Sequence, residues 1–195
     1  VEVKAYTRSI GPVEINYANF DDSAILETKT AMPDRDADAK AVAHLEEAMK
    51  NHDCVGGVME CVVTGMPAGI GDTVFEKLDA NLAKAMMSIG AVKAVEIGDG
   101  IQVAQAYGST NNDAFCMDDG LVSKKTNHAG GILGGMSDGS DIVIRAHVKP
   151  TPSIFSTQQT VNKSGEEIDI NIKGRHDPII VPRAVVVMEC MIAVT

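Results

Sequence analysis

The sequence has no tryptophan, few aromatic residues and only four cysteines among 195 residues. The cysteines show neither CxxC spacing nor the density of a disulfide framework, so we expect free or buried thiols in a reducing compartment and no metal site. No apolar run approaches the roughly 18–20 residues of a membrane-spanning helix. The first residues also lack the basic and apolar regions of a signal peptide. These absences predict a soluble, cytoplasmic protein without a membrane partner.

Basic residues are scarce as well, because 17 Lys and Arg stand against 27 Asp and Glu, for a formal net charge of −10. A nucleic-acid-binding protein needs a basic stripe to contact phosphates, so this class is disfavoured. The acidic excess lies early, since residues 141–195 hold six residues of each sign. An anionic ligand would therefore meet less repulsion near the later cations Lys149, Lys173, Arg175 and Arg183. A well-solvated acidic first part accounts for the imbalance equally well.

Hydrophobic residues make up 45% of the chain, which is enough for a substantial core. Domains commonly hold about 100–200 residues, so residues 1–195 are expected to form a single domain. Strand and helix patterns alternate in the first hundred residues, which predicts a sheet layered against helices. A parallel Rossmann sheet is disfavoured because Val74 stands where the GxGxxG motif needs its third glycine, and Pro67 disturbs the preceding strand.

Hydrophobic periodicity predicts the individual elements. Helices are expected over residues 34–50, from Val74 until Gly90 stops the helix, and over residues 183–194. The predicted strands span residues 1–9, 13–16, 55–64, 91–97, 101–107, 142–148 and 168–173. We interpret the last two strands as antiparallel, and residues 109–126 as a mobile loop. The helix at 183–194 is apolar on nearly every side, which indicates a subunit interface.

Three segments carry residues suited to ligand chemistry. Asn127–Gly135 holds four glycines, so its backbone can approach a ligand and offer successive amide donors to an anion, or it is only a turn. Lys149–Ile154 reads KPTPSI and combines a cation with two hydroxyls, which suits a phosphate but also suits an ordinary strand exit. Arg175, His176 and Asp177 are consecutive in a loop, where Arg175 could alternatively pair with Asp177.

The order of four segments resembles the chorismate synthase family. These segments are KLDANLAKAMMSIGAVKAVEIGDG at residues 77–100, NHAGGILGG at 127–135, KPTPSI at 149–154 and KGRHDP at 173–178. The resemblance runs nearly end to end but includes nothing like the family's early GESHG and SGRE segments. It therefore implies a C-terminal part of a protein about twice this length. The implied fold is α+β, a layered sandwich of helices between mainly antiparallel β-sheets.

By this resemblance the complete enzyme converts 5-enolpyruvylshikimate 3-phosphate to chorismate in the shikimate pathway, with reduced FMN as cofactor. The family is also associated with NADP, and its members form homotetramers. The resemblance assigns the catalytic carboxylate to Asp177, beside the flavin N5. The implied flavin contacts are Gly90, Ala91, Gly134, Lys149, Pro150, Thr151, Pro152, Ser153 and Arg175.

The acid–base histidines of the family belong to its early segments, so His44, His52, His128 and His147 are interpreted as surface or core residues. For the same reason this chain alone is expected to be inactive. The departures from the family pattern remove no charged ligand group; they are Asp72, Thr73, Ala94 and Ile179. Two other classes stay open, a non-enzymatic flavin- or nucleotide-binding module and an oligomerisation module.

Overall fold

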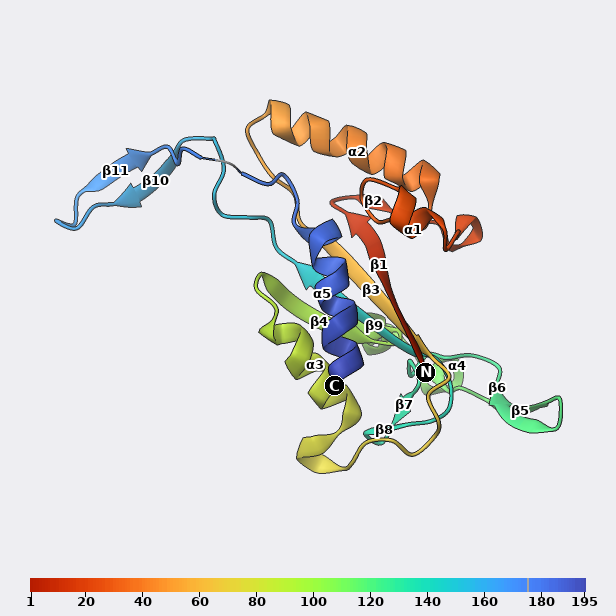
Figure 1. Ribbon diagram of the computed structural model, residues 1–195. Helices are drawn as coiled ribbons and strands as arrows, with labels where there is room; N and C mark the ends of the chain where they lie inside the picture. Colours follow the sequence, from red (N-terminus) through yellow and green to blue (C-terminus); the bar gives the residue numbers. More distant parts are fainter. Residues whose placement is uncertain (175) are drawn as a thin grey trace. The chain divides into compact units, whose positions relative to one another are not determined.

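The computed structural model describes every residue of the chain except Arg175 (Figure 1). The strands are β1 (Glu2–Ile10), β2 (Val13–Glu14), β3 (Gly57–Thr64), β4 (Val92–Ile97), β5 (Phe115–Asp118), β6 (Leu121–Lys124), β7 (Ile132–Leu133), β8 (Met136–Ser137), β9 (Ile142–Val148), β10 (Gln158–Val161) and β11 (Glu167–Ile170). The α-helices are α1 (Ala24–Glu27), α2 (Arg35–Lys50), α3 (Leu78–Ser88), α4 (Gly108–Asn111) and α5 (Val181–Val194). Short 3-10 helices are η1 (Tyr17–Asn19), η2 (Val74–Glu76) and η3 (Gly100–Gln105).

The fold is mixed α+β, as the sequence predicted. A five-stranded sheet has the strand order β2-β1-β3-β9-β4. Strand β2 pairs antiparallel with β1, with Ser9 opposite Glu14 and Ile10 opposite Val13. Three further two-stranded sheets are antiparallel hairpins, β5–β6, β7–β8 and β10–β11.

The chain divides into two compact units. Unit 1 comprises Val1–Tyr6, Met59–His147 and Ala184–Thr195, and unit 2 comprises Thr7–Val58 and Val148–Arg183. Each unit buries apolar side chains of its own, such as Met59, Met86 and Ile144 in unit 1. The single domain over residues 1–195 stays a prediction.

Helix α2 of unit 2 shows how the sequence specifies a local element. Asp34 caps the helix, since its side chain accepts hydrogen bonds from the amides of Asp36 and Ala37. Ala37, Ala41 and Leu45 recur at helical spacing and are buried, so the predicted helix at residues 34–50 is confirmed.

Two segments differ from their predicted structures because glycine turns redirect the chain. Residues 101–107 were predicted to be a strand, but η3 occupies most of this range and follows positive-φ turns at Gly98 and Gly100, whose φ angles are 59° and 57°. Residues 109–126 contain α4 and the β5–β6 hairpin rather than an irregular loop. The pair Asp119-Gly120, with φ angles of 46° and 81°, is a sequence feature typical of such a hairpin.

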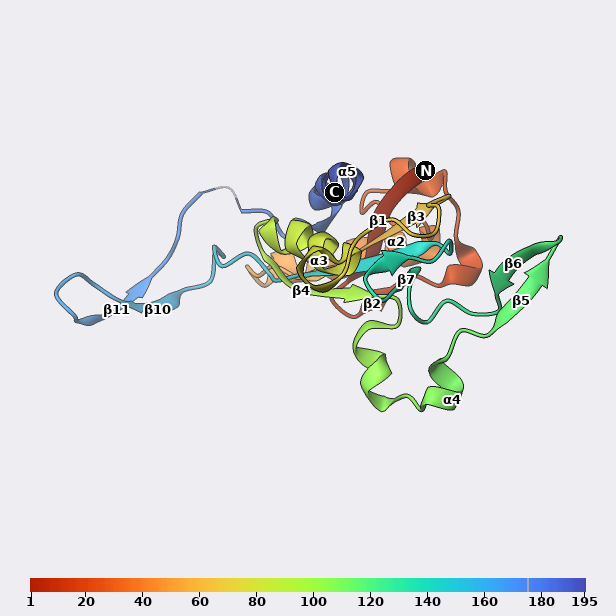
Figure 2. The ribbon, with the colours of Figure 1, turned by 90° about the horizontal axis from the view of Figure 1, so that it is seen from below.

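Two further expectations were wrong in part. The helix predicted from Val74 starts only at Leu78, and Val74 and Phe75 are 70% and 86% exposed. Val74 has a φ of 58°, which is a left-handed backbone conformation. A right-handed α-helix requires negative φ angles, so Val74 cannot belong to α3. Strand β11 pairs with β10, whereas β9 lies inside the five-stranded sheet. Both hairpins β5–β6 and β10–β11 extend away from the helices of their own units (Figure 1, Figure 2).

Helix α5 confirms the helix predicted over residues 183–194. Val181, Val185, Met188 and Ile192 are buried at spacings of three and four, whereas Val186 and Val187 are exposed. In unit 1 the helix lies against β1, because Glu189 Oε2 accepts a hydrogen bond from the Ala5 amide at 3.0 Å. Among the described residues, none of the helices has the length and apolar character required to traverse a membrane.

Candidate functional site

Unit 2 brings together two of the motifs singled out in the sequence. The hydroxyl of Thr151, within KPTPSI, donates a hydrogen bond to the carbonyl oxygen of Asp177 at 3.2 Å. Cys54 also binds this segment, since its thiol donates to the Thr151 carbonyl at 3.0 Å. The Val55 amide donates to the carbonyl of Pro178 at 2.9 Å. The chain segment after α2 therefore fixes both motifs relative to each other.

A cavity of about 150 Å³ lies at this junction. Ser153 and Asp177 both line it, together with Ile154 and the aromatic side chains of Phe155 and His176. Phe155 meets His176 edge to face, with ring centroids 4.3 Å apart. Of the residues assigned by resemblance in KPTPSI, Ser153 alone is among the described lining residues, and Thr151 contributes through its hydrogen bond. Lys149 and Pro152 are exposed in the same segment.

Asp177 forms an ion pair with Arg183 in the first turn of α5. The sequence had suggested Arg175 as an alternative partner, but Arg175 lies outside the described residues. Arg183 was named in the sequence only as one of several late cations. Its role follows from the tertiary structure, because Pro178–Ile180 turns the chain so that residues six positions apart meet. A carboxylate paired with a guanidinium is held in one orientation.

In unit 1 the glycine-rich loop Asn127–Gly135 packs closely against backbone segments. A Cβ on Gly130 would lie 2.3 Å from the Gly98 nitrogen, and one on Gly131 would lie 2.5 Å from the Asp141 oxygen. A Cβ on Gly135 would lie 2.7 Å from the oxygen of Asp72. These three glycines are therefore required by packing.

Gly134 differs from the other glycines of the loop. It has a φ of 62°, yet nothing lies within 4 Å of the position that its Cβ would occupy. It forms the tight turn between β7 and β8, in which Leu133 pairs with Met136. The side of the loop at Gly134 is therefore open to a ligand, which fits the close approach of a large planar group.

The amides at the start of the loop are already used within the protein. The His128 and Ala129 amides donate to the carboxylate of Asp113 at 2.8 and 3.0 Å. The Gly130 and Gly131 amides donate to the carbonyl and side-chain oxygens of Asn127 at 3.1 and 2.8 Å. An anion bound by this loop would therefore contact donors other than the amides of residues 128–131.

Gly90 and Ala91 form the turn between α3 and β4 in unit 1. Gly90 is exposed, and the space around its Cβ position is open. Ala91 is half-buried with a φ of 71°, a left-handed conformation that is uncommon for a residue with a side chain. A ligand could reach this turn through backbone atoms.

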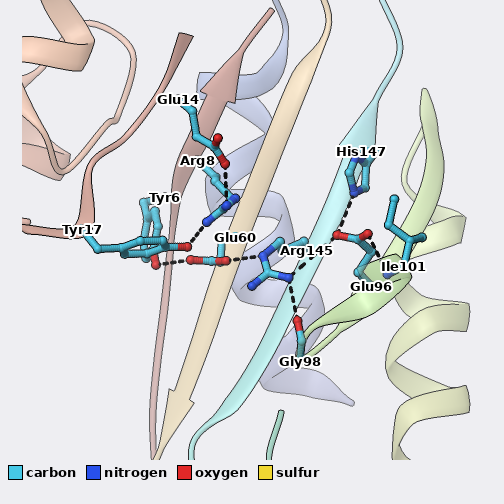
Figure 3. A network of polar contacts seen from close by, with 10 residues as sticks. All are labelled: Tyr6, Arg8, Glu14, Tyr17, Glu60, Glu96, Gly98, Ile101, Arg145 and His147. Atoms are coloured by element: carbon cyan, nitrogen blue, oxygen red, sulfur yellow. Dashed lines mark hydrogen bonds and ion pairs between the residues drawn. The ribbon is translucent and has the colours of Figure 1, made fainter. Parts of the chain in front are cut away.

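A polar network connects strands of the five-stranded sheet within unit 1 (Figure 3). Arg145 on β9 donates from Nε to Glu60 Oε2 and from Nη1 to the Gly98 carbonyl, both at 2.6 Å. Tyr6 donates its hydroxyl to the other oxygen of Glu60 at 2.5 Å. The buried Glu60 carboxylate is thus neutralised by Arg145, and Arg145 holds the Gly98 turn against which Gly130 packs.

Glu96 extends this network on β4. Burial disfavours its charged form, but hydrogen bonds from the Ile101 amide and His147, with the charges of His147 and Arg145, outweigh burial and lower the pKa of Glu96. His147 Nε2 lies 3.2 Å from Glu96 Oε2. The sequence analysis did not assign a role to Glu60 or Glu96. A charged residue inside the apolar run at 55–64 was the feature that could have indicated Glu60.

The site residues assigned by resemblance thus fall in both units, with Gly90, Ala91 and Gly134 in unit 1 and Lys149–Ser153 and Asp177 in unit 2. Within the described part of the chain, no group of three or more His, Cys, Asp or Glu side chains is placed to hold a metal ion. Unit 2 offers hydroxyls, the exposed cation Lys149 and the paired carboxylate of Asp177, and unit 1 offers an open glycine turn. Such a set suits an anionic organic ligand.

The fold and these motifs define a mixed α+β protein with antiparallel sheets and a ligand-accessible glycine turn. The family model described as chorismate synthase matches residues 1–195, and the chain belongs to the chorismate synthase family.

Individual relatives agree with this assignment. The chain is 64% identical over 195 residues to the chorismate synthase of Agathobacter rectalis, covering 100% of this chain and 53% of that protein. It is 48% identical to the chorismate synthase of Methanococcoides burtonii, covering 99% of this chain and 54% of that protein. A crystal structure of chorismate synthase matches with a TM-score of 0.80 at 26% identity, covering 99% of this chain and 55% of that one. The chain spans about half the length of the curated relatives that it matches.

Proposed function

We propose that the gene product carrying this chain is a chorismate synthase that converts 5-enolpyruvylshikimate 3-phosphate to chorismate and phosphate. The reaction is a 1,4-elimination, in which the carbon–oxygen bond to phosphate breaks and a hydrogen leaves the ring. The observation that carries the proposal is the junction of KPTPSI with Asp177 in unit 2, in a chain whose family match extends over residues 1–195. This junction places Ser153 and Asp177 around one cavity.

Reduced FMN, when bound, supplies an electron transiently and recovers it, so the reaction has no net redox change. Gly134 and the turn at Gly90 and Ala91 would admit the flavin closely, because their Cβ positions or backbone atoms are accessible. Lys149, Thr151 and Ser153, between Pro150 and Pro152, would bind its polar groups, and Arg175 would add a cation. Asp177, oriented by Arg183, would accept a proton at the flavin N5.

The test is an anaerobic assay of chorismate and phosphate formation with reduced FMN, comparing the full-length gene product with residues 1–195 alone. Turnover is expected only for the full-length product, because the family's acid–base histidines lie in segments that residues 1–195 do not contain. FMN binding without turnover by the full-length product would support a flavin-binding module instead. Failure to bind FMN, with intact association, would support an oligomerisation module.

Replacing Gly134 by Asn tests the flavin contact. Asparagine tolerates the left-handed conformation at φ 62°, so the fold should be kept, while its side chain fills the open space on the ligand side. Because the added side chain would obstruct the flavin, we expect FMN to bind at least about tenfold more weakly in a fluorescence titration, which corresponds to about 1.4 kcal/mol.

The matched control is Gly165→Asn in the β10–β11 turn, where φ is 81° and the Cβ position is also open. This variant should bind FMN like the unmodified protein. Equal FMN affinity for both variants would contradict the placement of flavin at Gly134.

The proposed assembly is a homotetramer that uses the exposed Val186 and Val187 of α5 as part of an interface. Sedimentation velocity of the full-length gene product measures its oligomeric state. A strict monomer at high concentration would contradict this proposal.

A further inference from the structure

We propose that Asp113 is a positioning residue, whose carboxylate holds the first turn of the glycine-rich loop in the conformation that admits the flavin. The proposal rests on the proposed function for its ligand, whereas the loop geometry is independent of it. Asp113 lies outside all four segments that carry the family resemblance, and it precedes the β5–β6 hairpin.

The carboxylate of Asp113 accepts hydrogen bonds from two amides of the loop and from one hydroxyl just before it. Its Oδ1 accepts from the hydroxyl of Thr126 at 2.7 Å and from the His128 amide at 2.8 Å. Its Oδ2 accepts from the Ala129 amide at 3.0 Å. Two successive amides that bind one carboxylate form a small anion-binding concavity. In this protein the concavity is filled by the carboxylate of Asp113 rather than by a bound anion.

The β5–β6 hairpin explains why these residues meet. Its strands pair from Phe115 opposite Lys124 to the turn at Asp119. The Lys125 amide continues the pairing by donating to the Ala114 carbonyl at 2.9 Å. Beyond these strands, the side chains of Asp113 and Thr126 meet in the 2.7 Å hydrogen bond, so the hairpin brings the carboxylate to the residues at the start of the loop.

The loop has a second anchor on its other side. The Asp99 amide donates to the His128 carbonyl at 2.9 Å, and His128 Nδ1 lies 2.6 Å from Asp99 Oδ2. Gly98 and Gly130 approach so closely in this region that neither position leaves room for a side chain. Asp113 and Asp99 therefore both bind His128, and Asp113 also binds Ala129.

Asp113 has the charge that this role needs. Burial disfavours the carboxylate, but the bonds from Ala129, Thr126 and His128, with the charge of His128, outweigh burial and lower the pKa of Asp113. An ionised acceptor binds amides more strongly than a neutral one. Asparagine at this position would keep the shape of the side chain but would replace one carboxylate oxygen by an NH₂ group. This NH₂ group is a donor, and it would face the amide or hydroxyl donors that now bind Asp113.

The experiment compares Asp113→Asn with Asp118→Asn in the full-length gene product. Asp118 lies on the same hairpin and is exposed, so its substitution makes the same change of charge without touching the loop. Thr126→Val is a milder second variant that removes one hydroxyl and keeps both amide contacts. Two quantities are measured for each protein: hydrogen exchange of the His128 and Ala129 amides, and the dissociation constant of FMN.

For Asp113→Asn we expect the hydrogen-exchange rates of the His128 and Ala129 amides to rise by about 10- to 100-fold, as for the loss of hydrogen bonds to a charged group. The FMN dissociation constant should rise by about the same factor. Thr126→Val should change both quantities less, and Asp118→Asn should change neither. Unchanged exchange in Asp113→Asn would overturn the inference. Faster exchange with unchanged FMN affinity would overturn the role in flavin binding.

If the unmodified protein itself binds no FMN, the proposed function fails. The exchange data would still decide whether Asp113 holds the loop. Global stability, measured by urea unfolding of each variant, separates a local loosening of the loop from general unfolding, because a local effect raises exchange at His128 and Ala129 without moving the unfolding midpoint.

Discussion

Asp177→Asn in the full-length gene product is expected to slow chorismate formation by a factor of roughly 10²–10⁴, the usual contribution of one general base. Asparagine has nearly the same shape and keeps one oxygen that can accept a hydrogen bond from Arg183, but it cannot take a proton. The backbone contact between Thr151 and residue 177 involves the carbonyl and should persist. FMN affinity should therefore change little, as measured by titration beside the steady-state rate.

Arg175→Ala provides the contrast. Loss of a charge-assisted contact commonly costs about 1.5–3 kcal/mol. This variant should therefore weaken FMN binding more than it lowers the turnover rate of the FMN-bound enzyme. If Asp177→Asn weakened binding and Arg175→Ala slowed only turnover, the two roles would have been exchanged. If neither variant changed binding or rate, KGRHDP would be a structural turn in this protein.

Among the substitutions proposed for this protein, Arg145→Met is expected to reduce stability most, by about 3–5 kcal/mol in the free energy of unfolding. The guanidinium neutralises the Glu60 carboxylate, which is 1% exposed, and also binds the Gly98 carbonyl. Methionine fills a similar volume but leaves the buried carboxylate with Tyr6 as a hydrogen-bond donor and no positive charge from residue 145. Urea unfolding measures the effect.

Two variants control for this result. Glu60→Gln combined with Arg145→Met removes both charges and should recover part of the loss, since it also removes the buried carboxylate charge with which Arg145 pairs. Arg35→Met breaks an exposed ion pair with Glu27 and should be far milder, because exposed pairs contribute little. Equal losses for Arg145→Met and Arg35→Met would show that the buried network does not stabilise the sheet.

The elements with clear periodicity could be predicted from the sequence. Strand β9 alternates strictly between buried and half-buried residues, α2 buries residues at a spacing of four, and α5 buries residues at spacings of three and four. In each of these elements the pattern of side chains matches the geometry of one regular structure, so local information is sufficient. The order of the four motifs likewise identified the family, which the match over residues 1–195 confirms.

The segments that were predicted wrongly depend on backbone conformation. Residues 101–107 have the composition of a strand, but turns with positive φ at Gly98 and Gly100 turn the chain into η3. Val74 was assigned to a helix by its spacing, although its left-handed backbone keeps it outside α3. Apolar spacing cannot report such angles, because it describes where side chains would point only after the backbone is known.

The residue types of the candidate site were present in the sequence, whereas their partners were decided by the tertiary structure. The motif KGRHDP contains Asp177, but only the fold pairs it with Arg183 and joins it to Thr151. Asp113 lies in a segment with no clear period, and it reaches His128 only because a hairpin closes between them. The sequence by itself determined the elements with clear periodicity and the family, since these depend on local spacing and motif order. Contacts between residues distant in sequence required the packed chain, because burial and backbone geometry select each partner only after folding.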